Sequence, residues 1–134
     1  MESKIRVRYK ETDQMGIAHH SNYYPWFEVA RTELMRAKGL TYREMEERGL
    51  MLPLVETHCR YRQGAKYDDL LTIRCFISQF NGVRLTVEYE VIRDEDGALI
   101  AQGKTVHAVT NRELKPVNLR KADPEIYELF MSCL

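Results

Sequence analysis

Residues 70–110 read LLTIRCFISQFNGVRLTVEYEVIRDEDGALIAQGKTVHAVT. Segments 70–80, 83–93 and 98–110 of this stretch are predicted to be strands. Asn81-Gly82, between the first two, is a strong signal for a hairpin turn, and the acidic run Asp94–Gly97 forms the second turn. Because short turns join antiparallel neighbours, the stretch predicts most of an antiparallel sheet.

The residues before this stretch predict one more strand and a long helix. Residues 52–62 have strand character, and a helix is expected over 22–38, capped by Ser21 or Asn22 and stopped by Gly39. Apolar side chains recur in this segment at helical spacing, which indicates a broad buried face. The members of that face are Tyr23, Trp26, Phe27, Ala30, Leu34 and Ala37.

Shorter elements complete the expected order. Residues 5–10 alternate apolar and basic side chains, which predicts a half-buried strand, and residues 11–22 form an irregular loop. The capping box Thr41–Glu44 starts a short helix that ends near Arg48. Asp123-Pro124 starts a terminal helix that ends near residue 131. The chain is therefore predicted to be α+β, one domain over 1–134 with a sheet that wraps one central helix.

Composition excludes several classes of protein. The 134 residues include 20 basic and 20 acidic side chains, so the net charge is near zero and non-specific nucleic-acid binding is not expected. No apolar run is long enough to span a bilayer, and the N-terminus lacks the apolar region of a signal peptide. Cys59, Cys75 and Cys133 are widely spaced and form no CxxC pair. We expect a reduced, cytoplasmic protein with no metal site.

The stretch with the clearest chemical potential is YKETDQMGIAHHSNYYPWFEVARTELMR, residues 9–36. Asp13 lies in a loop directly before the helix, and the unpaired N–H groups of a helix start bind negative charge. Such donors can stabilise the oxyanion that forms when a carbonyl is attacked. A carboxylate opposite them can attack or take a proton from water. The alternative is that Asp13 is only a turn or cap residue.

The same stretch closely resembles the 4-hydroxybenzoyl-CoA thioesterase family, in particular its YbgC-like acyl-CoA thioesterase branch. The resemblance covers nearly the whole chain and implies the hot-dog fold. The matching residues are Tyr9, Glu11-Thr12-Asp13, Gly16, His20, Tyr23, Phe27-Glu28, Arg31-Thr32-Glu33, Tyr67, Asp69, Leu71-Thr72-Ile73 and Ala101-Gln102-Gly103-Lys104-Thr105.

The resemblance implies that Asp13 is the catalytic carboxylate, as nucleophile or as general base, and that the backbone N–H of His20 polarises the thioester carbonyl. His19 stands where this branch usually has an aromatic residue such as Tyr, so the contact made by that side chain with substrate is open. His20 could contact substrate or brace the loop. The rim of the aromatic cluster that begins at Tyr23 could line the acyl pocket.

Coenzyme A, which is part of the expected substrate, needs positive charge for its phosphates. Arg84, just after the hairpin turn, is the preferred contact because a guanidinium matches phosphate. Arg60, Arg62, Lys66, Arg112 and Lys115 are the other basic candidates. Basic residues at a strand edge can instead block aggregation. His19 and His20 are adjacent, so their side chains should diverge and share no metal. Glu28 and Arg31 are spaced as an ion pair on the helix.

The expected reaction is hydrolysis of an acyl-CoA to the carboxylic acid and CoA, without a metal or redox cofactor. Two rivals are a hydroxyacyl-thioester dehydratase, whose expected His and Gly-Pro segment is not found, and a non-catalytic acyl-CoA binder. The resemblance also implies a homodimer that joins two sheets, or a homotetramer, with sites at the subunit boundary. The acyl group is left open, because fold and motif do not set the depth of a pocket.

Overall fold

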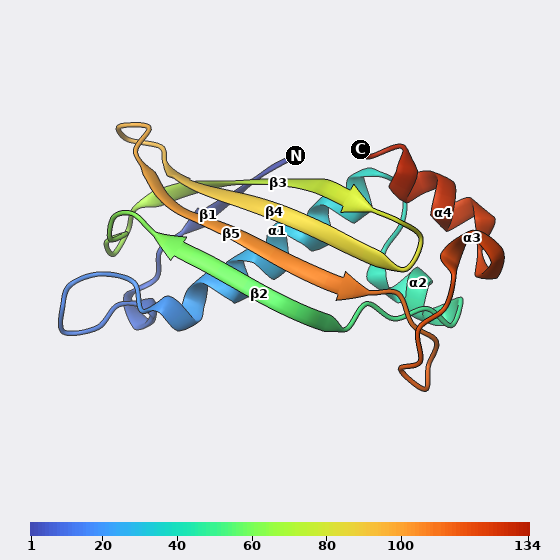
Figure 1. The fold of residues 1–134 in the computed structure, drawn as a ribbon. Coiled ribbons are helices and arrows are strands. Elements are labelled where there is room, and N and C mark those ends of the chain that lie inside the picture. The colour runs from blue at the N-terminus through green and yellow to red at the C-terminus, as the bar shows by residue number, and fades with distance from the viewer.

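The computed structural model describes all 134 residues, as one antiparallel sheet with helices (Figure 1). In chain order the elements are β1 (Glu2–Arg6), the 3-10 turns η1 (Tyr9–Glu11) and η2 (His20–Asn22), α1 (Tyr23–Ala37), α2 (Tyr42–Glu47), β2 (Leu54–Tyr61), β3 (Leu70–Phe80), β4 (Arg84–Arg93), β5 (Leu99–Ala108), α3 (Leu119–Ala122) and α4 (Pro124–Met131). The predicted α+β plan and both predicted hairpins are confirmed.

The sheet has the strand order β1-β3-β4-β5-β2, and every neighbouring pair is antiparallel. β2 precedes β3 in the chain but pairs with β5, so β1 and β2 form the two edges of the sheet. Figure 1 shows α1 lying along one face of the sheet, with α3 and α4 gathered at one end. This arrangement places the start of α1 near the end of β2, at the opposite end of the molecule from α4.

The core lies between α1 and the sheet. Alternate residues of β4 face the helix, as the period of a strand requires, and none of them is more than 1% exposed: Leu85, Val87, Tyr89 and Val91. Phe27 of α1 stacks on Tyr89 with the ring centroids 4.3 Å apart. The predicted aromatic face of α1 is buried, except for Ala37, which lies exposed in the last turn of the helix.

The first strand was predicted over 5–10 and instead runs from Glu2 to Arg6. Arg6 pairs with Leu70, the first residue of β3, so beyond it the chain has no strand partner. The backbone N–H of Val7 then donates to the carbonyl of Asp69, 2.9 Å away, and the chain turns into η1. Tyr9, predicted to be in the strand, lies in η1 and is 79% exposed.

Local capping signals were largely correct. Gly39 follows the C-cap of α1 with φ +88°, and the Thr41 side chain accepts from the backbone N–H of Glu44 at the start of α2. Asp123 caps α4, with Pro124 in the first turn. The short helix α3, capped by Asn118, was not predicted. It is only four residues long, and no apolar period can mark so short a helix.

A chain of polar groups crosses the core from α1 to the edge of the sheet. Arg31 donates to the hydroxyl of Tyr89 at 3.0 Å, Tyr89 and Thr105 hydroxyls are 2.7 Å apart, and Thr105 is 2.9 Å from His107 Nε2. His107 Nδ1 lies 3.0 Å from the carbonyl of Leu52 and must donate to it. Nε2 is therefore the acceptor in the neutral ring, and each hydroxyl donates toward His107.

The predicted pairing of Glu28 with Arg31 is wrong, because Arg31 belongs to this series of polar groups. The guanidinium of Arg31 points to hydroxyls, donating to Tyr42 at 2.7 Å as well as to Tyr89, and is not paired with Glu28. The reason is that Arg31 lies on the half-buried flank of α1, whereas Glu28 is exposed. Hydroxyl groups from α2 and β4 reach Arg31 there, and helical spacing alone cannot reveal them.

Burial lowers the pKa of His107 to about 4, from 6.5, although the carbonyl of Leu52 opposes this shift. The unfolded chain therefore binds a proton at His107 that the folded chain excludes, and stability falls as the pH drops from 6.5 toward 4. The expected loss from this residue is about 2 kcal/mol between pH 8 and pH 5.

Urea unfolding of the wild-type protein and of His107→Gln at several pH values would measure this loss. Gln can keep both hydrogen bonds but does not titrate, so its free energy of unfolding should fall less between pH 8 and pH 5. Comparing slopes removes any constant difference in stability between the two proteins. Identical slopes would show that the pKa of His107 is the same in the folded and unfolded states, which would contradict the shift.

No helix of the structure combines the length and the apolar character needed to cross a membrane.

Candidate active site

Three separate parts of the chain line one cavity of about 520 Å³ at the start of α1. Its lining residues come from the loop 13–20, from Tyr23 at the start of α1, and from residues 61–64, where β2 ends. The cavity thus contains four of the five predicted site residues: Asp13, His19, His20 and Tyr23. Arg84 is not among its lining residues.

Asp13 begins a tight loop that closes on itself. Its backbone N–H donates to the carbonyl of Ile17 at 3.2 Å, and its carbonyl accepts from Gly16 at 2.9 Å. Gly16 has φ +80°, a conformation that a side chain would strain. Asp13 Oδ1 accepts from the backbone N–H of Met15 at 2.9 Å, while Oδ2 has no hydrogen bond within the chain. One carboxylate oxygen is therefore anchored and the other is available for chemistry.

The start of α1 supplies an unpaired donor on the other side of this loop. The N-terminal turn is η2, and the side chain that caps it is His19, whose Nδ1 accepts from the backbone N–H of Ser21 at 3.2 Å. The predicted capping by Ser21 or Asn22 is therefore wrong, and the Asn22 side chain makes no cap bond. The N–H of His20 donates to no acceptor in the chain. It lies at the positive end of the helix, where it can bind an anionic oxygen.

The two histidine rings lie against each other, with centroids 4.1 Å apart and planes tilted by 32°. The prediction that they diverge is wrong, because His19 is extended while His20 already belongs to the 3-10 turn. His19 Nδ1 is also 2.8 Å from the hydroxyl of Ser21, which fixes the orientation of the ring. No group of three metal-ligating side chains is present in the chain.

Tyr23 and Tyr61 are the tyrosines that line the cavity. Tyr23 is only 2% exposed and meets the ring of Tyr61 edge-on, with centroids 4.9 Å apart. Burial raises the pKa of Tyr23 to about 12, so its hydroxyl stays protonated at neutral pH and can donate but cannot act as a base. Tyr61, in contrast to Tyr23, is exposed.

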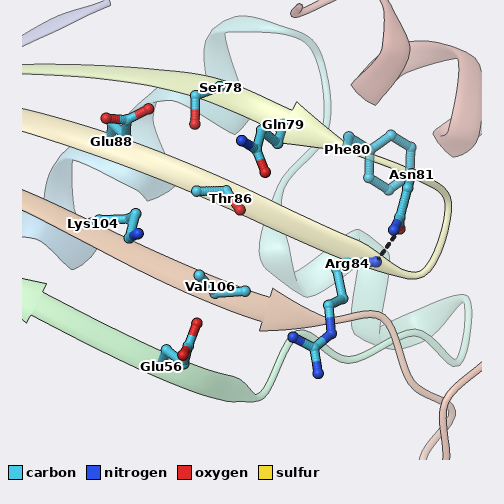
Figure 2. A pocket seen from close by; sticks show the side chains of 10 residues that line it. All are labelled: Glu56, Ser78, Gln79, Phe80, Asn81, Arg84, Thr86, Glu88, Lys104 and Val106. Atoms are coloured by element: carbon cyan, nitrogen blue, oxygen red, sulfur yellow. Dashed lines mark hydrogen bonds between the residues drawn. The ribbon is translucent and has the colours of Figure 1, made fainter.

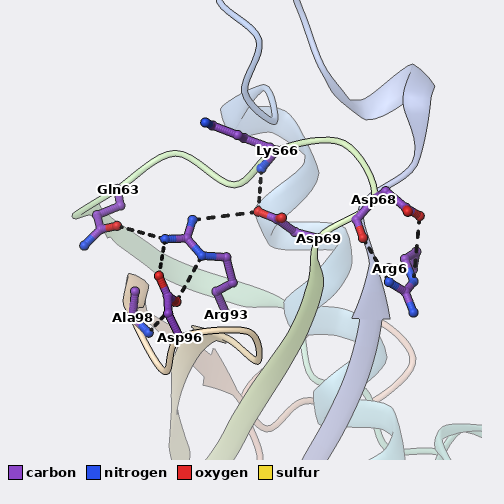
Figure 3. Close-up of polar contacts among 8 residues, drawn as sticks. All are labelled: Arg6, Gln63, Lys66, Asp68, Asp69, Arg93, Asp96 and Ala98. Atoms are coloured by element: carbon purple, nitrogen blue, oxygen red, sulfur yellow. Dashed lines mark hydrogen bonds and ion pairs between the residues drawn. The ribbon is translucent and has the colours of Figure 1, made fainter.

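The wall formed by residues 61–64 packs directly against the Asp13 loop. A Cβ on Gly64 would lie 2.3 Å from Ile17 Cγ2, so only glycine allows this approach. The backbone N–H of Ala18 donates to the carbonyl of Ala65 at 2.7 Å. Arg93 of β4 stabilises this segment (Figure 3). Its guanidinium donates to the side-chain oxygen of Gln63 at 3.3 Å and forms an ion pair with Asp69 at 3.8 Å. Arg93 also donates to Asp96 at 2.9 Å.

Residues 7–128 match the model of the thioesterase-like superfamily. The chain belongs to this superfamily. YneP of Bacillus subtilis is 35% identical over 123 residues, which are 91% of this chain and 88% of YneP. The acyl-CoA thioesterase YbgC of Haemophilus influenzae is 33% identical over 91 residues, or 67% of each chain.

A solved structure of similar fold is the DHNA-CoA thioesterase of Staphylococcus aureus, with a TM-score of 0.92 and 28% identity over 98% of this chain and 88% of that one. The protein TT1821 of Thermus thermophilus has a TM-score of 0.91 and 31% identity, covering 99% and 98% of the two chains. These likenesses confirm the YbgC-like thioesterase family and the hot-dog fold, both expected from residues 9–36.

Arg84 lies away from the cavity of this thioesterase-family chain. Because Leu85 faces α1, Arg84 points to the other face of the sheet, and Figure 2 shows it at the mouth of a groove there, with α1 behind the strands. Lys104 lines the same groove together with Glu56 and Glu88. The negative charges of the two glutamates oppose the binding of phosphate there. Within one chain, Asp13 and Arg84 are not brought together, and the contact between Arg84 and phosphate stays a prediction.

Arg62 is the arginine that lines the Asp13 cavity. Its guanidinium donates to the side chain of Gln102 on β5 at 3.1 Å. From the sequence, Arg62 is one of several basic candidates, and Gln63 and Gly64 carry no signal of a role in the site. These residues lie about fifty positions after Asp13 in the sequence. Only the pairing of β2 with β5 brings them to the cavity, so no local signal distinguishes them.

Proposed function

We propose that this chain hydrolyses an acyl-CoA thioester to a carboxylic acid and CoA. The observation that carries the proposal is the pairing, in one cavity, of a carboxylate that has an available oxygen, Asp13, with an unpaired helix-start N–H, at His20. The names of relatives agree, since YbgC of H. influenzae is an acyl-CoA thioesterase and the S. aureus neighbour a DHNA-CoA thioesterase.

The thioester carbonyl oxygen accepts from the N–H of His20, where the positive end of α1 stabilises the charge that develops on it. Asp13 Oδ2 either takes a proton from a water that attacks the carbonyl carbon, or attacks that carbon itself. In both routes a C–O bond forms, the C–S bond breaks, and the thiolate of CoA leaves and takes up a proton. In the second route water then hydrolyses the acyl–Asp13 anhydride. Water is the only co-substrate, and no metal or redox cofactor takes part.

The other side chains of the cavity contact the substrate. The neutral hydroxyl of Tyr23 and the rings of His19 and His20 border the space beside Asp13, where the acyl group enters. Arg62 at the rim, and Arg84 in an assembled oligomer, supply positive charge for the phosphates of CoA. The three cysteines are free thiols, which agrees with a reducing cytoplasm.

The two edges of the sheet differ, and the difference favours a homodimer joined through β2. β1 presents Lys4 and Arg6, which block pairing of strands. β2 also carries the charged Glu56 and Arg60, but it presents the exposed apolar side chains Leu54, Val55 and Tyr61, and nothing in the chain pairs with its outer edge. Antiparallel pairing of two β2 strands would join the sheets and place the cavity, which borders Tyr61, at the subunit boundary. Pairs of such dimers could form a tetramer.

A matched pair of substitutions tests this interface. Leu54→Asp places a carboxylate on the proposed interface, and Leu114→Asp places one on a loop where Leu114 is 63% exposed, against 55% for Leu54. We expect Leu54→Asp to weaken dimerisation at least roughly tenfold, because an unpaired buried charge is costly. Leu114→Asp should have no effect. Sedimentation at several concentrations measures both, and a monomeric wild-type protein at micromolar concentration would contradict the arrangement.

The proposed activity is tested by measuring thiol release from short and long aliphatic, hydroxybenzoyl and dihydroxynaphthoyl CoA thioesters. Release of one CoA for each acid formed is the expected result, and the preferred thioester identifies the acyl class. An enoyl thioester as product would indicate a dehydratase. Binding without turnover of any thioester would indicate a binding protein, and either result would overturn the proposal.

A further inference from the structure

Glu11 is a buried carboxylate, 4% exposed, two residues before Asp13. Its two oxygens accept from different parts of the chain. Oε1 accepts from the backbone N–H of Arg8 at 2.7 Å, and Oε2 accepts from the indole N–H of Trp26 in the second turn of α1 at 3.0 Å. The guanidinium of Arg8 lies 3.4 Å from Oε2, toward solvent. The side chain therefore ties the exit of β1 to α1.

The backbone of Glu11 makes a second connection, to the start of the helix. Its carbonyl accepts from the N–H of His19 at 2.8 Å and from the side-chain amide of Asn22 at 2.9 Å. Asn22 also donates to the carbonyl of His19 at 3.1 Å. One residue thus joins the segment that follows β1, the residue before His20 and the N-terminal part of α1.

We propose that Glu11 is a positioning residue, which fixes the carboxylate of Asp13 relative to the backbone N–H of His20. This inference rests on the proposed hydrolysis. Asp13 follows Glu11 by two residues, and His20 follows His19, which is bonded to the Glu11 carbonyl. The loop tip between them, residues 14–16, is exposed and cannot hold the distance by packing. Catalysis depends on such distances to within about 1 Å, and an error of that size can cost about 100-fold in rate.

The chemistry of the contacts requires a carboxylate at this position. Both partners, the N–H of Arg8 and the indole N–H of Trp26, are donors, and each uses a different oxygen of Glu11. A glutamine has one oxygen and one amide group, so its amide would face one of the two donors. Glu11→Gln should therefore release one connection while almost preserving the volume of the side chain.

The kinetic test uses Glu11→Gln, Trp26→Phe and the double variant. We expect kcat to fall about 10- to 100-fold in each single variant, with KM changed less than about threefold, because the reacting groups are displaced while the cavity persists. The loss in the double variant should be smaller than the product of the two single losses, since both substitutions act on the contacts of one carboxylate. Glu47→Gln, which alters an exposed ion pair with Arg43 on α2, is the control and should leave kcat unchanged.

Hydrogen exchange tests the connection without relying on activity. Backbone amides of residues 12–22 should exchange at least tenfold faster in Glu11→Gln than in the wild-type protein, while β3, β4 and β5 keep their protection. Unchanged exchange in 12–22 would overturn the inference, as would a parallel loss of protection throughout the sheet or an unchanged kcat. If no thioester is hydrolysed by the wild-type protein but exchange changes as expected, the proposed hydrolysis fails while the role of Glu11 in holding the loop stands.

Discussion

Asp13→Asn is expected to reduce kcat for thioester hydrolysis by about 10³-fold, within the range that a general base or nucleophile contributes. Asparagine has almost the same shape as aspartate. Its side-chain oxygen can still accept the hydrogen bond that the backbone N–H of Met15 donates to Asp13 Oδ1 at 2.9 Å. The loop should therefore keep its fold. The change removes the negative charge and the basic oxygen, and with them the ability to activate water or to attack the carbonyl carbon.

Asp68→Asn is the matched control for this change. Asp68 is exposed, has φ +71°, and lies outside the cavity, so asparagine fits its backbone and touches no substrate. Thiol release by both variants should be measured with circular dichroism and sedimentation, so that a loss of activity can be separated from a loss of fold. Equal activity of Asp13→Asn and wild type would show that Asp13 does not carry the reaction.

Gly103→Ala is expected to destabilise the protein by about 3 kcal/mol, the upper range for overpacking a core. The added Cβ would lie 2.3 Å from Cε2 and 2.5 Å from Cζ of Phe27. The ring cannot move away easily, because it is fully buried and stacks on Tyr89 at 4.3 Å. A loss of this size lowers Tm by roughly 10 °C in a domain of this length.

Two further variants define the cause of this loss. Phe27→Leu in the Gly103→Ala background removes the ring atoms that clash, so the substitution at 103 should cost less there than in the wild-type background. Gly97→Ala meets no atom within 4 Å but has φ +71°, and should cost only about 1 kcal/mol through backbone strain. Thermal unfolding of these variants, of Phe27→Leu alone and of the wild-type protein measures each cost. If Gly103→Ala is as stable as wild type, the packing of Phe27 against β5 is wrong.

The sequence by itself determined most of the elements and part of the site. The Asn81-Gly82 turn, the Gly39 stop, the Thr41 cap and the Asp123-Pro124 start all depend on a few consecutive residues, and each was predicted correctly. The family could likewise be identified from residues 9–36. Asp13 and His20 lie within this one segment, so their presence in a common cavity followed from a local motif.

The tertiary structure alone decided which distant groups complete or brace the site. Residues 61–64 reach the Asp13 loop through the pairing of β2 with β5. Arg84 lies on the face of the sheet away from α1, because side chains alternate between the two faces along β4. Arg31 bonds to tyrosine hydroxyls from other elements, and Glu11 to the indole of Trp26. Turns and caps depend on dihedral angles and hydrogen bonds of neighbouring residues, which the sequence specifies directly. Contacts between distant residues depend on register and strand order, which become definite only when the whole sheet closes over α1.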